Sequence, residues 1–367
     1  MKFNERFYDK KLASGLVRAI EKKAGGKKFV FMEVCGTHTV SMFRSGIRSI
    51  LPPSVKMISG PGCPVCVTAD RDIDYMLAIA RLRDTTILTF GDMMKVPSVD
   101  SSLEKEKAEG CDIRVVYSPL EILDVCRQNP GRNVVFFSIG FETTTPTIAA
   151  ALKKAKQEKI RNLFVYPVNK LIPPAMKALL EMGEVRVDGF MCPGHVSTII
   201  GADAYNPIAA GYNVPCVITG FEPLDILQGI YMLTEQASGM KNKKGKAGVS
   251  VQYKRCVDGK GNTEAQRIMS EVFSVADANW RGIGVIPGSG QKLSDKYADF
   301  DAAVKFRIKL PEQKIKKGCR CGEILRGLID PGECPMFGKA CTPENPYGPC
   351  MVSVEGTCAA HYKYSGQ

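Results

Sequence analysis

The clearest candidates for chemistry in this sequence are Cys63 and Cys66, which lie in the stretch GPGCPVC. The stretch follows a predicted strand, so we expect Cys63 at the N-terminus of a short helix, where backbone N–H groups and the helix dipole stabilise a thiolate. Cys66 would then lie one turn later, and the pair predicts a reversible dithiol. The same spacing also occurs in half of a zinc site, but the sequence contains no second Cys-x-x-Cys stretch to complete one.

Cys35 and His38 form a second candidate pair, in the stretch CGTHT. They stand about one helical turn apart, so a thiol and an imidazole can face one ion or one substrate. A buried structural thiol is the commoner fate of a cysteine, but the chain has only three histidines, which favours a functional His38. His195 lies in a similar turn, CPGHVST, where a hydrogen-bonded histidine at a capped helix start is the alternative.

Two carboxylates follow predicted strands in the same way. Asp92 lies in GDMMKVP and Glu142 in GFETT. Each side chain can cap a helix N-terminus, or it can orient a histidine that binds a metal. The sequence leaves both alternatives open.

Cysteine is concentrated at the C-terminal end, where six of the 14 cysteines lie. The spacing Cys-x14-Cys-x6-Cys-x16-Cys lacks the paired knuckles of a zinc ribbon and the compact run of a bacterial ferredoxin. Four thiolates spread over a loop can hold a [4Fe-4S] cluster, and zinc or disulfides are the alternatives. The four positions with this spacing are Cys319, Cys334, Cys341 and Cys358, and two further cysteines, Cys321 and Cys350, exceed a set of four ligands.

Apolar segments precede most of these turns and predict the elements that position them. Each segment ends in a glycine-containing turn that leads into a helical pattern. This alternation predicts an α/β fold with parallel sheets covered on both faces. Ligands of such sheets bind beyond the carboxyl ends of the strands, so the polar turns predict a cleft. The predicted strands cover residues 29–34, 55–59, 86–90, 134–139, 187–191 and 214–219.

A length of 367 residues, 44% of them hydrophobic, predicts about two to three globular domains. We place a first α/β domain with CGTHT and CPVC at residues 1–130, and a second with GFETT and PGHVS at 131–309. The chain is free to cross between them. In residues 310–367 the periodicity is lost and Pro, Gly and Cys dominate, so a metal or cluster must supply what a small core cannot.

Composition also narrows the function. The net charge of +12 comes partly from the runs at 241–246 and 314–320, which lack the interleaved aromatic residues of single-strand nucleic-acid binders and are read as solvated loops. No apolar stretch is long enough for a membrane span. The N-terminus has no secretion signal, which predicts an intracellular protein whose cysteines do metal or redox work. Neither G-x-x-x-x-G-K-S/T nor G-x-S-x-G occurs, so ATP hydrolysis and serine hydrolase chemistry have no support.

Taken together, CGTHT, GPGCPVC, GFETT, PGHVS and the C-terminal cysteine spacing resemble the HypD family, the iron–sulfur scaffold proteins of [NiFe]-hydrogenase maturation. The resemblance extends from about residue 28 to the C-terminus. It implies a cytoplasmic protein with two Rossmann-like domains whose parallel sheets flank a cleft, and a small C-terminal region that binds a [4Fe-4S] cluster.

The resemblance implies an assembly scaffold rather than a turnover enzyme. On it the Fe(CN)2CO centre is built with the small chaperone HypC, and cyanide arrives from HypE as a thiocyanate, with HypF upstream. The hydrogenase large subunit then receives the iron centre. Neither nucleic acid nor a membrane is among the implied partners.

Individual roles are also implied by the resemblance. Cys35 binds Fe(II) of the nascent centre, Cys63 and Cys66 are the redox-active pair, and His38 ligates or orients nearby. The implied cluster ligands are Cys319, Cys334, Cys341 and Cys358, and the remaining motif residues around the cleft are Asp92, Glu142 and His195. Two other functions stay open: an iron–sulfur thiol–disulfide reductase, which leaves Cys35 and His38 without a role, and a zinc-stabilised interaction module.

Overall fold

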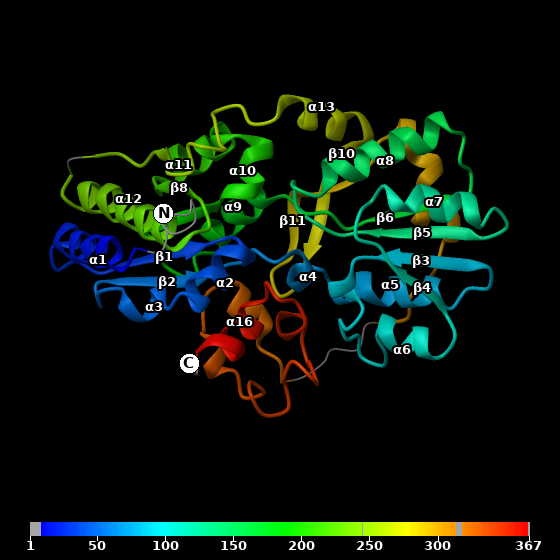
Figure 1. The fold of residues 1–367 in the computed structure, drawn as a ribbon, viewed down its shortest axis with the longest axis horizontal. Coiled ribbons are helices and arrows are strands. Elements are labelled where there is room, and N and C mark those ends of the chain that lie inside the picture. The colour runs from blue at the N-terminus through cyan, green and yellow to red at the C-terminus, as the bar shows by residue number, and fades with distance from the viewer. Residues whose placement is uncertain (1–8, 244, 313–317, 366–367) are drawn as a thin grey trace.

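The computed structural model describes residues 9–243, 245–312 and 318–365. Its strands form two parallel sheets and one antiparallel hairpin, with helices on the faces of the sheets (Figure 1). The predicted α/β class is confirmed, and a strand is present within a few residues of each predicted position. None of the helices in these ranges is long and apolar enough to cross a membrane.

The first sheet has the order β2-β1-β7-β8-β9, and all its neighbours are parallel. Glu33 pairs with Ser59 on one side and with Met191 on the other, so the turns after β1, β2 and β7 emerge at one edge. The elements are α1 (Lys10–Ala24), β1 (Phe29–Glu33), α2 (Gly36–Arg44), α3 (Ile47–Ile50), β2 (Val55–Ser59), β7 (Gly189–Pro193), α10 (Gly194–Ile200), α11 (Asn206–Tyr212), β8 (Cys216–Thr219), α12 (Pro223–Lys241) and β9 (Val249–Val251).

The second sheet has the order β4-β3-β5-β6, and it is also parallel throughout. It is formed by one continuous part of the chain, between the two parts that make the first sheet. Its elements are α4 (Pro64–Val67), α5 (Asp70–Ala80), β3 (Thr85–Thr89), η2 (Gly91–Met93), α6 (Leu103–Ala108), β4 (Asp112–Val115), α7 (Glu121–Gln128), β5 (Asn133–Ser138), α8 (Thr145–Gln157), β6 (Leu163–Pro167) and α9 (Ile172–Met182).

Residue 130, the expected boundary between the two α/β domains, does not separate the strands of one sheet from those of the other. β5 begins at Asn133 and pairs with β3, whereas β7 to β9 join β1 and β2 in the first sheet. The chain therefore leaves the first sheet after β2 and returns to it at β7. Pairing of β1 with β7 depends on contacts between distant segments, which local apolar patterns do not encode.

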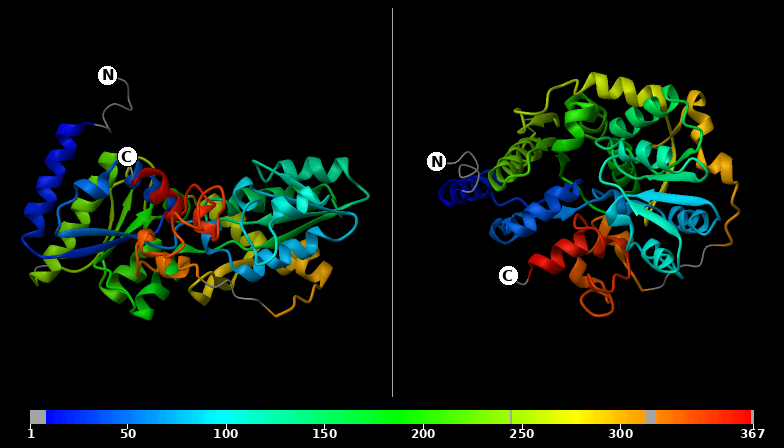
Figure 2. Two further views of the ribbon diagram at one scale, coloured as in Figure 1. Left: turned by 90° about the horizontal axis from the view of Figure 1, so that it is seen from below. Right: turned by 45° about the vertical axis from the view of Figure 1, so that its right-hand side comes forward.

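The remaining chain forms a hairpin and a C-terminal region of short helices. The C-terminal region (residues 318–365) lies below the junction of the two sheets in Figure 1, and the left view of Figure 2, from below, shows it between them. Residues 314–317 of one predicted basic loop and residue 244 of the other lie outside the described ranges. The elements are α13 (Thr263–Val272), β10 (Phe273–Trp280), β11 (Gly284–Leu293), η4 (Asp295–Phe300), α14 (Ala302–Phe306), α15 (Cys321–Leu325), η5 (Pro331–Glu333), η6 (Pro349–Met351) and α16 (Thr357–Tyr364).

Helix α12 covers one face of the first sheet, and a glycine sets its distance from β8. A Cβ atom on Gly229 would lie 1.9 Å from Cγ2 of Thr219, a buried residue of β8. Thr219 is β-branched and cannot swing away freely. The same threonine contacts His38, so this packing also supports the candidate site.

Gly229→Ala should therefore destabilise the fold, because the added methyl group overpacks the interface between α12 and β8. We expect a loss of about 1–3 kcal/mol in the free energy of unfolding, measured by denaturant titration. Gly239 lies in the same helix with open space around it, so Gly239→Ala should be neutral or stabilise by up to about 1 kcal/mol. Equal stability of the two variants would contradict the packing described here.

Candidate functional site

The turns that follow β1 and β2 are joined by their backbones. Cys35 is the N-cap of α2 and has an extended backbone, with φ −150° and ψ 121°. Its N–H donates to Glu33 Oε2 at 3.0 Å, and the next N–H, of Gly36, donates to the carbonyl oxygen of Gly62 at 2.9 Å. The CGTHT and GPGCPVC motifs therefore form one structure.

Gly62 makes this contact possible. A Cβ atom at that position would lie 2.2 Å from the nitrogen and 2.4 Å from the Cα atom of Cys35. These atoms are backbone and cannot move aside. The glycine before Cys63 therefore serves the close approach of the two cysteine-bearing turns.

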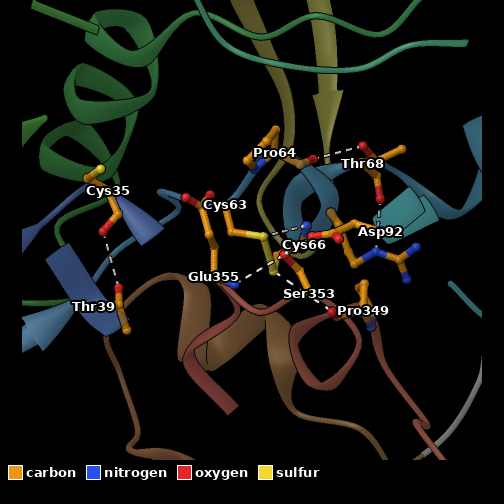
Figure 3. Close-up of a disulfide and its surroundings, with 11 residues drawn as sticks. Cys35, Thr39, Cys63, Pro64, Cys66, Thr68, Asp92, Pro349, Ser353 and Glu355 are labelled. Atoms are coloured by element: carbon orange, nitrogen blue, oxygen red, sulfur yellow. Dashed lines mark hydrogen bonds between the residues drawn. A yellow bond between two sulfur atoms is a disulfide. The ribbon is translucent and has the colours of Figure 1, made fainter. Parts of the chain in front are cut away.

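Cys63 and Cys66 are joined by a disulfide, with their Cα atoms 5.2 Å apart (Figure 3). Cys63 is the N-cap of α4, as the sequence predicts, and its Sγ accepts a hydrogen bond from the N–H of Cys66 at 3.2 Å. Both cysteines are buried. The structure thus contains the oxidised form of the predicted dithiol.

A carboxylate that the sequence analysis missed, Glu355, lies between Cys35 and Cys63 in Figure 3. Its Oε1 accepts a hydrogen bond from the hydroxyl of Thr37 at 2.8 Å, and a Cβ atom on Gly36 would lie 2.5 Å from the Glu355 Cβ. Burial raises the pKa of Glu355. A lone glutamate in a segment rich in Pro, Gly and Cys carries no local signal, because only tertiary contact brings it here.

Asp92 belongs to the same part of the structure but does not contact a histidine among the described residues. Its Oδ2 accepts a hydrogen bond from the Ser353 hydroxyl at 2.9 Å, and Ser353 Oγ accepts the N–H of Glu355 at 3.2 Å (Figure 3). Asp92 therefore fixes the segment that carries Glu355.

His38 and His195 both stack on the ring of Phe221, with centroid distances of 4.7 Å and 3.9 Å. His38 is buried, and its Nε2 lies 3.0 Å from both the Gly220 carbonyl oxygen and Thr219 Oγ1. Burial lowers the pKa of His38 to about 4, so the ring is neutral at neutral pH. Because the carbonyl requires Nε2–H as donor, Nδ1 carries the lone pair, and Nδ1 has no partner among the described residues.

Cys35 is also uncharged in its present surroundings. Burial, with the nearby charges of Glu355 and Glu33, raises the pKa of the Cys35 thiol to about 12. A thiolate forms there at neutral pH only when a cation compensates its charge. The site is therefore suited to a metal and unsuited to a free nucleophile.

Among the described residues, the Glu142 side chain makes its hydrogen bond with α9 and not with the two cysteine-bearing turns. Its Oε1 accepts the N–H of Ile172, the first residue of α9, at 2.9 Å, so of the two alternatives the structure shows a helix cap. Its Oε2 is buried without a partner among the described residues, and burial raises the pKa of Glu142 to about 7. The carboxylate borders a separate cavity of about 300 Å³, whose other walls include Gln266 and Phe273.

The six C-terminal cysteines converge on one small cavity of about 10 Å³. Its other walls are Gly348 and apolar side chains of α15 and the neighbouring loops; no carboxylate or imidazole lines it. In the described ranges no three His, Cys, Asp or Glu side chains are arranged to hold a single metal ion. The only possible ligands around this cavity are thiols, which suits an iron–sulfur cluster. Binding of a cluster would require these thiols to lose their protons and reorient.

The cysteine-rich region also touches the disulfide. Cys66 Sγ lies 3.9 Å from the carbonyl oxygen of Pro349, whose chain neighbour Cys350 lines the small cavity. Within the C-terminal region, Tyr347 N–H donates to Cys341 Sγ at 3.3 Å. The dithiol and the cysteine cluster are therefore adjacent, although about 250 residues separate them in sequence.

A family model described as "HypD: Hydrogenase formation hypA family" matches residues 11–365. The chain belongs to the HypD family. It is 44% identical to the hydrogenase maturation factor HypD2 of Bradyrhizobium diazoefficiens, over 99% of this chain and 97% of that protein. Similar relatives are the hydrogenase maturation factors HypD of Escherichia coli, at 44% identity over 92% of this chain and 89% of that protein, and of Azotobacter vinelandii, at 42% over 100% and 98%.

Glu142→Gln should change how stability depends on pH. The folded pKa of Glu142, about 7, lies above the ordinary value of 4.5, so the protonated form is favoured by folding and stability is lost as pH rises through about 7. Gln keeps the acceptor for Ile172 and does not ionise. Relative to the parent, the variant should gain about 3 kcal/mol in unfolding free energy between about pH 5 and pH 8. Parallel stability curves across this range would contradict a buried, unpaired carboxylate.

Proposed function

We propose that the chain is a scaffold of [NiFe]-hydrogenase maturation, on which the Fe(CN)2CO centre is assembled with HypC and cyanide is received from HypE. One observation carries the proposal. Cys35 and the Cys63–Cys66 disulfide occupy adjoining turns, held together by the hydrogen bond from Gly36 to Gly62. A soft metal ligand and a two-electron donor therefore stand side by side.

Fe(II) is the cargo, and Cys35 is its ligand from this chain. Binding of the cation displaces the thiol proton, which the high pKa of Cys35 otherwise retains. Glu355 lies beside Cys35, and burial raises the pKa of its carboxylate, so it accepts that proton. His38, with its free Nδ1, ligates or orients nearby, and HypC supplies further ligands.

Cys63 and Cys66 supply the electrons for cyanide transfer. When the S–C bond of a thiocyanate on HypE breaks, cyanide passes to iron and the HypE sulfur leaves as a thiolate, which takes up two electrons. Oxidation of the Cys63–Cys66 dithiol to the disulfide provides those two electrons and releases two protons. The disulfide in the structure corresponds to the spent form.

The C-terminal region would hold a [4Fe-4S] cluster through Cys319, Cys334, Cys341 and Cys358. When bound, the cluster supplies electrons one at a time. The contact between Cys66 and Pro349 brings the dithiol to the edge of this region. Cys321 and Cys350 line the same cavity and are not needed as ligands.

A thiol–disulfide reductase acting on a partner protein is less well supported. It would use the C-terminal cysteines and the dithiol, but it gives no role to Cys35. The approach of Gly62 to the Cys35 backbone, too close for any side chain, ties the dithiol to that cysteine. The scaffold function gives a role to the dithiol and to Cys35.

Infrared spectroscopy tests the scaffold function. Anaerobically purified protein with its HypC partner should show cyanide and carbon monoxide stretches on iron, and Cys35→Ser should lose about tenfold or more of both, because a serine oxygen is a poor soft-metal ligand. Cys256→Ser, at an exposed cysteine, is the control and should keep them. Parent protein without either stretch, from cells making active hydrogenase, would count against the proposal. So would a Cys63→Ser, Cys66→Ser variant that still builds the cyanide-bearing iron.

Metal and sulfide analysis tests the cluster. The parent should contain iron and acid-labile sulfide, and Cys334→Ser should lose most of both, because one of four ligands is missing. Cys111→Ser, between α6 and β4 and not among the residues that line the cavity of the C-terminal cysteines, should retain them. Zinc without acid-labile sulfide in the anaerobic parent would refute the cluster and favour the zinc-stabilised module.

A further inference from the structure

The tip of the β10–β11 hairpin contacts the helix that carries the disulfide. Trp280, at the end of β10, is fully buried, and its Nε1–H donates to Ser289 Oγ at 2.8 Å. Trp280 forms a β-bridge with Thr68, and the N–H of Arg281 donates to the carbonyl oxygen of Val67 at 2.9 Å. Val67 directly follows Cys66, so the hairpin tip is fixed to the end of α4.

The same tip contacts the C-terminal region. Gly282 has φ +71°, and a Cβ atom on it would lie 2.2 Å from the Cα atom of Gly322. Gly322 belongs to α15, which begins at Cys321. The hairpin therefore touches both the dithiol helix and the cysteine-rich region, and none of its residues belongs to a motif of the sequence.

Arg281 presents a free donor at this junction. Its side chain is only 10% exposed, its Nε–H donates to the Thr68 carbonyl oxygen at 2.9 Å, and Nη1 pairs with Asp70. Nη2 is buried and has no hydrogen-bond partner within the described ranges. Buried N–H groups normally have an acceptor, so the Nη2 group of Arg281 can donate to a further acceptor at this junction.

Arg281 lies close to the cysteines of the C-terminal region, because its chain neighbour Gly282 packs against Gly322, which directly follows Cys321. Cysteine sulfurs that ligate a cluster are anionic and accept hydrogen bonds. Such hydrogen bonds and positive charge raise the reduction potential of a cluster.

We propose that Arg281 is a positioning residue that directs its Nη2–H to the sulfur atoms of the C-terminal region, and thereby raises the reduction potential of the [4Fe-4S] cluster. Its Nε and Nη1 meanwhile hold the residues that follow Cys66. This role rests on the proposed cluster, and it assigns a function to a residue outside every recognised motif.

The test is a redox titration of the cluster followed by electron paramagnetic resonance, on anaerobically purified full-length protein. Arg281→Gln should make the cluster at least tenfold harder to reduce, a fall of 59 mV or more for a one-electron couple. Arg281→Lys keeps the charge but not the free Nη2–H, and should give a smaller fall. It also serves as the second variant if Arg281→Gln does not retain the cluster.

Arg326→Gln is the matched control, because it removes one arginine charge from the same region. Arg326 pairs with Glu184 and donates to the Gly322 carbonyl oxygen. The potential of this variant should fall by clearly less than that of Arg281→Gln, because Arg326 already pairs with Glu184 and offers no free N–H to the cysteines. Equal shifts in potential for Arg326→Gln and Arg281→Gln would overturn the role of Arg281, and so would an unchanged potential in both Arg281 variants. If these variants contain normal amounts of iron and sulfide, the proposed function still stands. A parent without iron and sulfide would overturn the cluster itself.

Discussion

The structure of the candidate site depends on the absence of one side chain, at Gly62. Its Cα atom packs against the Cys35 backbone at a distance that excludes even a methyl group. This approach fixes the turn after β2 against the turn after β1, and the hydrogen bond from Gly36 to Gly62 completes it. Because both turns leave neighbouring parallel strands in register, the sheet sets their positions and the glycine sets their separation.

A second set of close contacts adds the C-terminal region to these turns. Gly36 leaves room for Glu355, Asp92 holds Ser353, and Gly282 meets Gly322. Each contact joins segments from different parts of the chain. The candidate site is therefore assembled from the first sheet, the second sheet, the hairpin and the C-terminal region, and no single segment forms it alone.

Local patterns in the sequence predicted much of this arrangement. Apolar runs located the strands that precede Cys35, Cys63, Asp92, Glu142 and His195, because a buried parallel strand needs a continuous apolar segment. The helix start at Cys63 was predicted from its place after a strand, and the structure has Pro64 at the first helical position, which favours that start. By contrast, strand order, the place of Glu355 and the hairpin tip at Arg281 depend on contacts between residues far apart in sequence. Glu142 shows the same limit, since its position after a strand was predicted but its role as a cap for α9 was not resolved.

Burial leaves the metal-binding candidates of the first sheet uncharged before any cargo arrives. Desolvation keeps the proton on the Cys35 thiol and keeps it off the His38 ring, and in both cases the neutral form is favoured. A cation entering such a site gains a thiolate and meets no competing ammonium or imidazolium charge. In the proposed function, the displaced proton would go to a nearby base, and Glu355 is positioned for this because the contact with Gly36 places it beside Cys35. Low polarity would then make metal binding and proton release a single event, which a solvent-exposed cysteine, already partly ionised, would not couple.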